Sequence, residues 1–184
     1  MEWNGILVTS VERTCVDLAA ARANLPQALT AFDTALRAEA DPETIERHLA
    51  VSRRGVAMAR RAFALADARA ESPGESWSRA LMIDAGLPLP DLQVEYILDS
   101  GRRAICDFGL DGVFVGEFDG LIKYMREIRR GESPEQVVIR EKIREDGLRD
   151  LGLDVGRWIW EDLRNGRMIA KLKARYDRLG IRYG

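Results

Sequence analysis

Three acidic side chains occupy the two most apolar runs in the middle of the chain. Asp107 lies within the run Ala104–Leu110, and Glu117 and Asp119 stand at the end of the run Val113–Phe118. A carboxylate that is buried without a partner is costly, so segments this apolar rarely carry acids without compensation. Carboxylates that converge at a strand end are typical of a divalent-metal site for phosphodiester chemistry.

The dipeptide between the two runs predicts how the acids come together. Asp111-Gly112 is a strong hairpin signal, and a hairpin closed there brings Asp107 level with the region just before Glu117. Glu117 and Asp119 are two residues apart and therefore share one face of a strand. The ammonium group of Lys123 follows a short distance along the chain.

A second interpretation is open from the residues alone. Acids at a strand end can simply be solvated, and Asp119-Gly120 can be a turn that leads into a helix. Residue type and spacing exclude neither interpretation, so the metal site is a hypothesis.

The composition is that of a globular protein rather than a disordered one. The 184 residues are 46% hydrophobic and 32% charged, which suits one domain, or one domain with a helical extension. The formal net charge of −2 argues against a generally basic nucleic-acid binder, but it allows a local basic patch.

The few cysteines and the single histidine limit the kinds of catalytic and metal site that the sequence can support. Cys15 and Cys106 lie far apart in patterns typical of buried residues, so neither a disulfide framework nor a zinc site is predicted. The single histidine, His48, leaves Ser–His and Cys–His mechanisms almost without support. The chain starts without the basic segment of a signal peptide, and no apolar run approaches the roughly 20 residues of a membrane span. We therefore expect a cytoplasmic protein without a membrane partner.

Residues 1–70 are predicted to form a helical region. Capping residues and apolar periodicity predict one helix over about 10–23 and three more that begin near Asn24, Asp41 and Gly55. The region holds no constellation of catalytic side chain types. Its arginine cluster suits a solvated face better than a phosphate site, and the members are Arg53, Arg54, Arg60 and Arg61.

Residues 71–184 show the alternation of a sheet protein. Ser72 and Glu75 form a capping box at the start of a helix. A strand at 94–98, the hairpin, a helix over 134–151, a strand at 155–160 and a helix over 165–179 follow. This order predicts an α/β (α+β) fold with a mixed sheet flanked by helices, preceded by the N-terminal helical subdomain.

An ordered set of short motifs runs through residues 72–179. The motifs are Ser72-Pro73-Gly74-Glu75-Ser76, Asp107-Phe108, Gly116-Glu117-Phe118-Asp119-Gly120, Lys123-Tyr124, Glu141-Lys142, Arg144-Glu145-Asp146 and Trp158-x-Trp160-Glu161-Asp162-Leu163. The set resembles the C-terminal nuclease-like domain of actinobacterial proteins grouped with AbiEi-type antitoxins. That domain is related to the very-short-patch-repair endonucleases and to the PD-(D/E)XK superfamily. The segment Val8–Leu18 resembles the helical part that follows a winged helix in these proteins, so the winged helix is expected to be missing here.

The resemblance implies a restriction-endonuclease-like sheet with a Mg²⁺ (or Mn²⁺) cofactor. Asp107 and Glu117 would ligate the ion, and Asp119 would add a further oxygen. Glu75 would hold a metal-bound water, and Lys123 would orient or deprotonate the attacking water. The capping box alone explains Glu75 equally well.

Two features depart from the superfamily pattern. The family lysine lies two residues after the second acid, where this chain has Asp119, so Lys123 would have to reach back past Gly120. The repair endonucleases use histidines in this region, and this sequence has none there. The departures bear on turnover more than on the fold.

Two functions remain as alternatives, with a purely structural role as a third. The retained Glu75, Asp107, Glu117 and Lys123 favour a metal-dependent DNA endonuclease. The missing DNA-reading module and the negative charge favour an antitoxin-like or regulatory module that binds DNA or protein and keeps the nuclease fold. The endonuclease would act on nucleic acid, DNA foremost, and without a targeting module it would need a protein partner or a shape-selective substrate. The residues expected to contact phosphate are Arg126, Arg129, Arg130, Lys171, Lys173 and Arg175.

Overall fold

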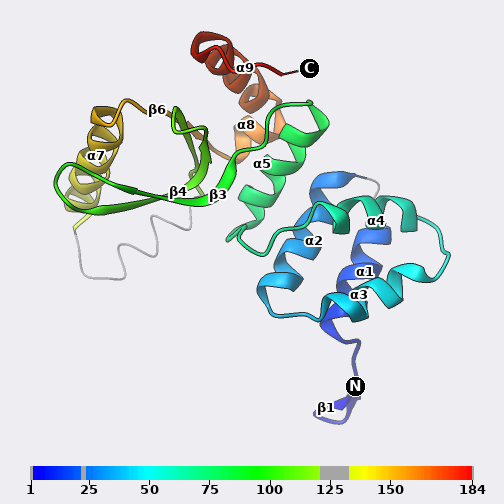
Figure 1. The fold of residues 1–184 in the computed structure, drawn as a ribbon. Coiled ribbons are helices and arrows are strands. Elements are labelled where there is room, and N and C mark those ends of the chain that lie inside the picture. The colour runs from blue at the N-terminus through cyan, green and yellow to red at the C-terminus, as the bar shows by residue number, and fades with distance from the viewer. Residues whose placement is uncertain (1, 22–23, 121–132, 184) are drawn as a thin grey trace. The chain divides into compact units, whose positions relative to one another are not determined.

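The computed structural model describes residues 2–21, 24–120 and 133–183 (Figure 1). The chain divides into two compact units, Met1–Ala80 and Leu81–Gly184. The division falls inside helix α5 (Pro73–Asp84), whereas the sequence suggested a boundary between residues 70 and 71. The first unit is helical apart from a short hairpin, and the second holds a four-stranded sheet.

Capping residues set the starts of the N-terminal helices. Asn24 accepts the N–H of Gln27 at the start of α2, and Asp41 accepts the N–H groups of Glu43 and Thr44 at the start of α3. The expected helical region is confirmed, with helices α1 (Val11–Ala21), α2 (Leu25–Arg37), α3 (Pro42–Ala50) and α4 (Val56–Ala64).

Helix α1 is the centre of the first unit, because it packs against α2, α3 and α4. Its buried residues are Cys15, Val16 and Ala19. Val11 and Leu18 are also apolar, yet they are exposed by half or nearly half of their area. The buried stripe is centred on small side chains, and these allow three helices to approach α1 closely.

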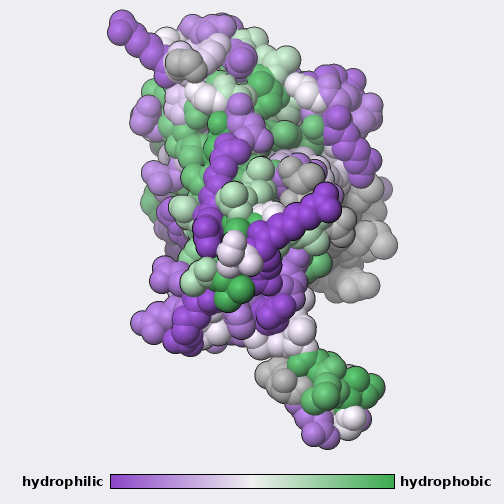
Figure 2. All heavy atoms as spheres, turned by 90° about the vertical axis from the view of Figure 1, so that its right-hand side faces the viewer, coloured by the Kyte–Doolittle hydropathy of each residue, from purple (hydrophilic) through white to green (hydrophobic). Residues whose placement is uncertain are grey.

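A short hairpin precedes the helices and carries exposed apolar side chains. Its strands are β1 (Glu2–Trp3) and β2 (Ile6–Leu7), and the turn residues Asn4 and Gly5 both have positive φ. Leu7 is 85% exposed. In Figure 2 this hairpin forms the green-tipped group at the lower end of the view.

The second unit is built on a mixed sheet, as the sequence predicted. The strands β3 (Asp91–Ile97), β4 (Arg103–Leu110), β5 (Phe114–Phe118) and β6 (Asp154–Trp158) lie in the order β3-β4-β5-β6. The first three are antiparallel, and β6 runs parallel to β5. Asp111 and Gly112 form the β4–β5 turn with φ of 51° and 66°, so the predicted hairpin is confirmed.

Helices flank both faces of this sheet (Figure 1). On one face Leu148 of α7 (Pro134–Asp150) clusters with Val115 and Val155. On the other, the ring of Tyr176 in α9 (Arg167–Leu179) lies 5.4 Å from that of Phe114. The strand expected to reach residue 160 ends at 158, and the short helix α8 (Trp160–Arg164) follows. Within the described part of the chain, every helix is too short or too polar to cross a membrane.

Candidate functional site

The carboxylate of Asp107 accepts a hydrogen bond that a backbone carbonyl group would accept in a regular ladder between β4 and β5. Regular pairing of the two strands ends at Phe108 and Gly116. Just beyond it, Asp107 Oδ2 accepts the N–H of Phe118 at 2.8 Å. On the other side of β4, the pairing with β3 skips Asp107 and Gln93, whose φ is +54°. Asp107 is therefore buried at an irregularity of the central strand.

The side chains of β4 change faces at this irregularity. Cys106 clusters with Leu148 on the α7 face, whereas the ring of Phe108 lies 5.4 Å from that of Trp158. Residues two apart on a regular strand share a face, so β4 must rotate between them, at Asp107. The acid thus occupies the one position of β4 where the strand geometry departs from regular pairing with both neighbours.

Glu117, on the adjacent strand, pairs with two arginines from different elements. Its side chain is 4% exposed, and Oε1 lies 2.5 Å from Nη2 of Arg144 in α7. Its Oε2 atom lies 3.2 Å from Nη2 of Arg157 in β6. The parallel pairing of β5 with β6 sets Glu117 beside Arg157. Each carboxylate oxygen therefore has its own guanidinium group.

Arg157 joins Glu117 to three further carboxylates. It lies 3.3 Å from Asp119, 3.1 Å from Glu145 and 3.6 Å from Glu141. We refer to Glu117, Asp119, Glu141, Arg144, Glu145 and Arg157 as the acid–arginine cluster. Its four carboxylates stand against two guanidinium groups, and Arg149 adds a third through its pair with Glu145, so carboxylates still outnumber the arginines that pair with them.

Burial and charge pairing act in opposite directions on the titration of this cluster. Burial disfavours the charged form of Arg144, but the pair with Glu117 outweighs it and raises the pKa of Arg144. The pKa of Arg157 is raised by the same balance, with Glu117 as the chief partner. Burial raises the pKa of the neighbouring Cys106 thiol to about 12, so this cysteine is protonated and unsuited to act as a nucleophile at neutral pH.

The lowered pKa of Glu145 predicts that the stability of the folded state depends on pH. The hydrogen bond from Arg149 is the chief cause that holds the pKa of Glu145 below its ordinary 4.5. A depressed carboxyl pKa stabilises the folded state above pH 4.5, and this stabilisation is lost as the pH falls through the folded value. We expect Arg149→Ala to lower the free energy of unfolding by under about 1 kcal/mol near neutral pH. In urea titrations, the difference from wild type should disappear well below pH 4.5, and a difference that persists there would contradict this assignment.

The partners of Glu117 were missed by reasoning from single residues. Glu141, Arg144 and Glu145 are part of the family-like motifs, but no role followed from their types. The usable signal is helical spacing, because Glu141 and Arg144 lie on the same stripe of α7 as the buried Val137 and Leu148. Charged residues within a buried stripe indicate a charged partner across the interface.

Glu75 belongs to the first unit, whereas the strand acids belong to the second. Ser72 Oγ donates to Glu75 Oε1 at 2.7 Å, and the N–H of Glu71 donates to Oε2 at 2.9 Å. Glu75 is thus engaged by the two residues that precede α5, within the first unit. Lys123 lies outside the described residues, together with Arg126, Arg129 and Arg130.

The basic residues of α9 are largely engaged within the second unit. Arg175 pairs with Asp154, and Lys171 Nζ lies 3.0 Å from Asp162. Lys173 Nζ lies 5.9 Å from the centre of the Tyr183 ring. Lys171 and Lys173 are still exposed, so they keep access to a ligand at the surface.

The strand acids can be compared with the ligands that a metal ion needs. No group of three or more His, Cys, Asp or Glu side chains in the described ranges is arranged to hold a metal. Mg²⁺, however, commonly uses one or two protein carboxylates together with waters and substrate phosphates. Asp107 and Glu117 supply such a pair of carboxylates, although both oxygens of Glu117 are already paired with guanidinium groups. A closed site made only of protein ligands is not what these residues form.

Two relatives were found, from two strains of Mycobacterium tuberculosis, and both are titled as uncharacterized proteins. Each is 33% identical over 181 residues, which cover 95% of this chain. The chain spans 64% of the length of each relative. No family model matches the chain, and no solved structure matches it.

Proposed function

We propose that the second unit is a metal-dependent phosphodiesterase, a DNA endonuclease of the PD-(D/E)XK type. The observation that carries this proposal is the pair of buried carboxylates on adjacent strands, Asp107 on β4 and Glu117 on β5. The two strand positions are linked by the hydrogen bond from the N–H of Phe118 to Asp107. A fold without a use for these charges would gain stability from apolar residues at both places.

The chain's own groups would divide the work as follows. Asp107 and Glu117 would hold Mg²⁺ or Mn²⁺, which supplies Lewis-acid stabilisation of charge on the phosphate when it is bound. Asp119, which pairs with Arg157 within the cluster, would hold a water or add a further oxygen ligand. Lys123 would orient the attacking water, and Glu75 remains a candidate through the family resemblance alone.

The nucleic-acid partner is proposed from charge and chemistry. The exposed Lys171 and Lys173 of α9 would contact backbone phosphates, which fix position without reading sequence. A protein partner would supply sequence targeting, because contacts to backbone phosphates do not read the base sequence. A cytoplasmic location fits this substrate and the two free, buried cysteines, Cys15 and Cys106.

A binding module without turnover is the second candidate, and the acid–arginine cluster favours it. Both oxygens of Glu117 face guanidinium groups, so a cation that binds Glu117 must compete with Arg144 and Arg157. If breaking the ion pairs of Glu117 costs more free energy than binding of the ion provides, the acids serve only as structural groups. Such a module would bind DNA or protein in the manner of an antitoxin.

Replacement of Asp107 by asparagine tests the proposal with little change in shape. The amide oxygen can still accept the Phe118 N–H, so the fold should persist while the charge is lost. We expect Mn²⁺ binding by calorimetry to disappear and Mn²⁺-dependent plasmid cleavage to fall by at least about 100-fold, because even second-shell changes cost 10- to 100-fold. Asp99→Asn, in an exposed turn of the same unit, is the matched control and should leave both unchanged.

Two other outcomes would contradict the proposal, the first its choice of residues and the second the activity itself. Cleavage by the Asp107→Asn variant at the wild-type rate would show that the site is assigned to the wrong residues. Absence of both Mn²⁺ binding and cleavage in the wild type would exclude the phosphodiesterase and leave the binding module, which gel-shift measurements with DNA would then test.

A further inference from the structure

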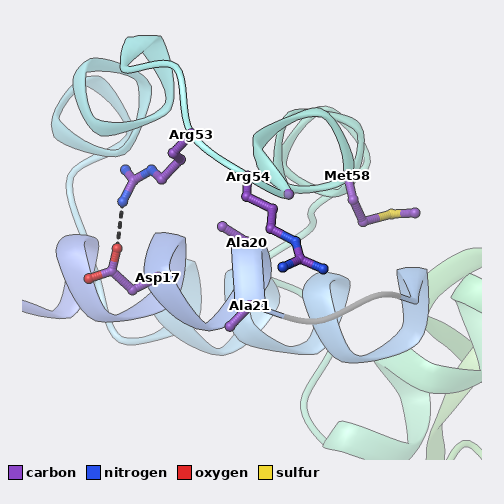
Figure 3. Close-up of a pocket in the computed structure, with 7 residues that line it drawn as sticks. Asp17, Ala20, Ala21, Arg53, Arg54 and Met58 are labelled. Atoms are coloured by element: carbon purple, nitrogen blue, oxygen red, sulfur yellow. Dashed lines mark hydrogen bonds and ion pairs between the residues drawn. The ribbon is translucent and has the colours of Figure 1, made fainter.

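A pocket of about 740 Å³ lies within the first unit, between the end of α1 and the loop that joins α3 to α4 (Figure 3). This volume is in the range of small-molecule sites. Nothing in the proposed function of the second unit uses it. Its lining residues are Asp17, Ala20, Ala21, Arg53, Arg54, Gly55 and Met58.

The loop is fixed against α1 by the close approach of two backbones. Gly55 has a φ of +80°, and a Cβ atom there would lie 1.9 Å from the carbonyl oxygen of Ala20. The two neighbouring arginines therefore extend from a defined piece of backbone. In Figure 3 the Arg53 side chain turns toward Asp17, whereas Arg54 extends toward the end of α1 beside Ala21.

The pocket carries an excess of positive charge. Asp17 accepts hydrogen bonds from both Arg13 and Arg53 at 2.6 Å, so one carboxylate is shared by two guanidinium groups. Arg53 is held further by the carbonyl oxygen of His48 at 2.8 Å. Arg54 has no hydrogen bond or ion pair with any residue in the described part of the chain. Its charge is left for a ligand.

The remaining walls are small and apolar, formed by Ala20, Ala21 and Met58. A ligand that matches both parts needs an anionic group for Arg54 and a flat apolar body for the alanines and the thioether. Guanidinium groups bind phosphate oxygens through charge-assisted hydrogen bonds, often in pairs. We propose that this pocket binds the phosphate of a nucleotide through Arg54, with the nucleobase against the apolar wall.

The nucleotide can be free or part of a nucleic-acid strand, and both present the same chemistry. The test follows the ε-methyl signal of Met58 in protein labelled with ¹³C-methionine, because this group reports from the pocket itself. Met82 and Met168, which are fully buried elsewhere, serve as internal references. The probes are adenosine monophosphate, adenosine without phosphate, and a short single-stranded oligothymidylate.

A shift of the Met58 signal with a phosphate-bearing probe, but not with adenosine, is the expected result. Arg54→Ala should weaken that binding by about tenfold or more, since a hydrogen bond to a charged group is lost. Arg61→Ala removes an arginine from α4 outside the pocket and should change it by less than about twofold. A response to the oligothymidylate alone would assign the phosphate to a strand, and a response to the monophosphate would assign it to a free nucleotide.

Three results would overturn the proposal: no movement of the Met58 signal with either phosphate probe, an equal response to adenosine, or equal weakening by the two arginine variants. The experiment measures binding in the first unit. Its result therefore does not depend on metal binding or cleavage at the strand acids of the second unit.

Discussion

Replacement of Glu117 by alanine is expected to lower the free energy of unfolding of the second unit by about 3–5 kcal/mol. The side chain is 4% exposed and faces Arg144 and Arg157. Its removal leaves the guanidinium groups partly buried with less counter-charge, and breaking one partner of a buried ion pair is among the costlier single substitutions. Hydrogen exchange of amides in β4–β6, compared between variant and wild type, measures the effect in the unit concerned.

A surface ion pair in the same unit provides the control. Glu95 pairs with the exposed Arg103 across the β3–β4 hairpin. Glu95→Ala removes the same side chain from a solvated pair and should cost less than about 1 kcal/mol. If the two alanine variants lose similar stability, burial of the Glu117 pair is not the source of the effect.

The double variant Glu117→Met/Arg144→Met separates loss of charge pairing from loss of volume. Replacing both partners of a buried pair with apolar residues is often neutral or stabilising. Arg157 retains Asp119, Glu141 and Glu145, so it does not depend on Glu117 alone. We expect the double variant to be more stable than Glu117→Ala, and equal or lower stability would contradict this account of the cluster.

The same contacts govern how activity data on Glu117 should be interpreted. A Glu117 variant without cleavage can be inactive because a metal ligand is lost or because the sheet has loosened. Asp107→Asn avoids this ambiguity, since its amide can keep the hydrogen bond to Phe118. Asp107→Asn therefore tests the metal site, whereas Glu117→Ala tests the stability of the ion pairs, although both acids are candidates for the same ion.

The hairpin was predictable because its signals are local. Asp111-Gly112 favours the positive φ values that the turn adopts, and the alternation around it sets the register. The irregularity at Asp107 was not predictable. It depends on Gln93, a residue type with no special preference for positive φ, in a different strand.

The acid–arginine cluster depends on packing between elements distant in sequence. Val138 and Ile143 are also apolar residues of α7, but both are more than half exposed. The buried side is defined by Val137 and Leu148, and it carries Arg144 to Glu117 between them. Local periodicity could not choose between these sides because apolar residues stand on each. The metal site itself stays a prediction.

Gly55→Ala is the second substitution expected to have a large effect. A Cβ at residue 55 meets the backbone oxygen of Ala20 at 1.9 Å, and α1 cannot retreat because Val16 and Ala19 are fully buried. Left-handed strain and overpacking together are expected to cost the first unit about 2–5 kcal/mol. Hydrogen exchange of α1 and α4 amides measures this loss.

Gly101→Ala isolates the contribution of the close approach. Gly101 has a similar φ of +76°, but a Cβ there would meet nothing within 4 Å. Its substitution should therefore cost only the strain, about 1–2 kcal/mol in its own unit. A Gly55→Ala variant that is no less stable than Gly101→Ala would mean that α1 and the loop are not in contact as described.

Because the same contact fixes the backbone from which Arg54 extends, a loss of stability in Gly55→Ala should be accompanied by weaker phosphate binding in the pocket. Unchanged binding would show that Arg54 does not need this loop to be held against α1.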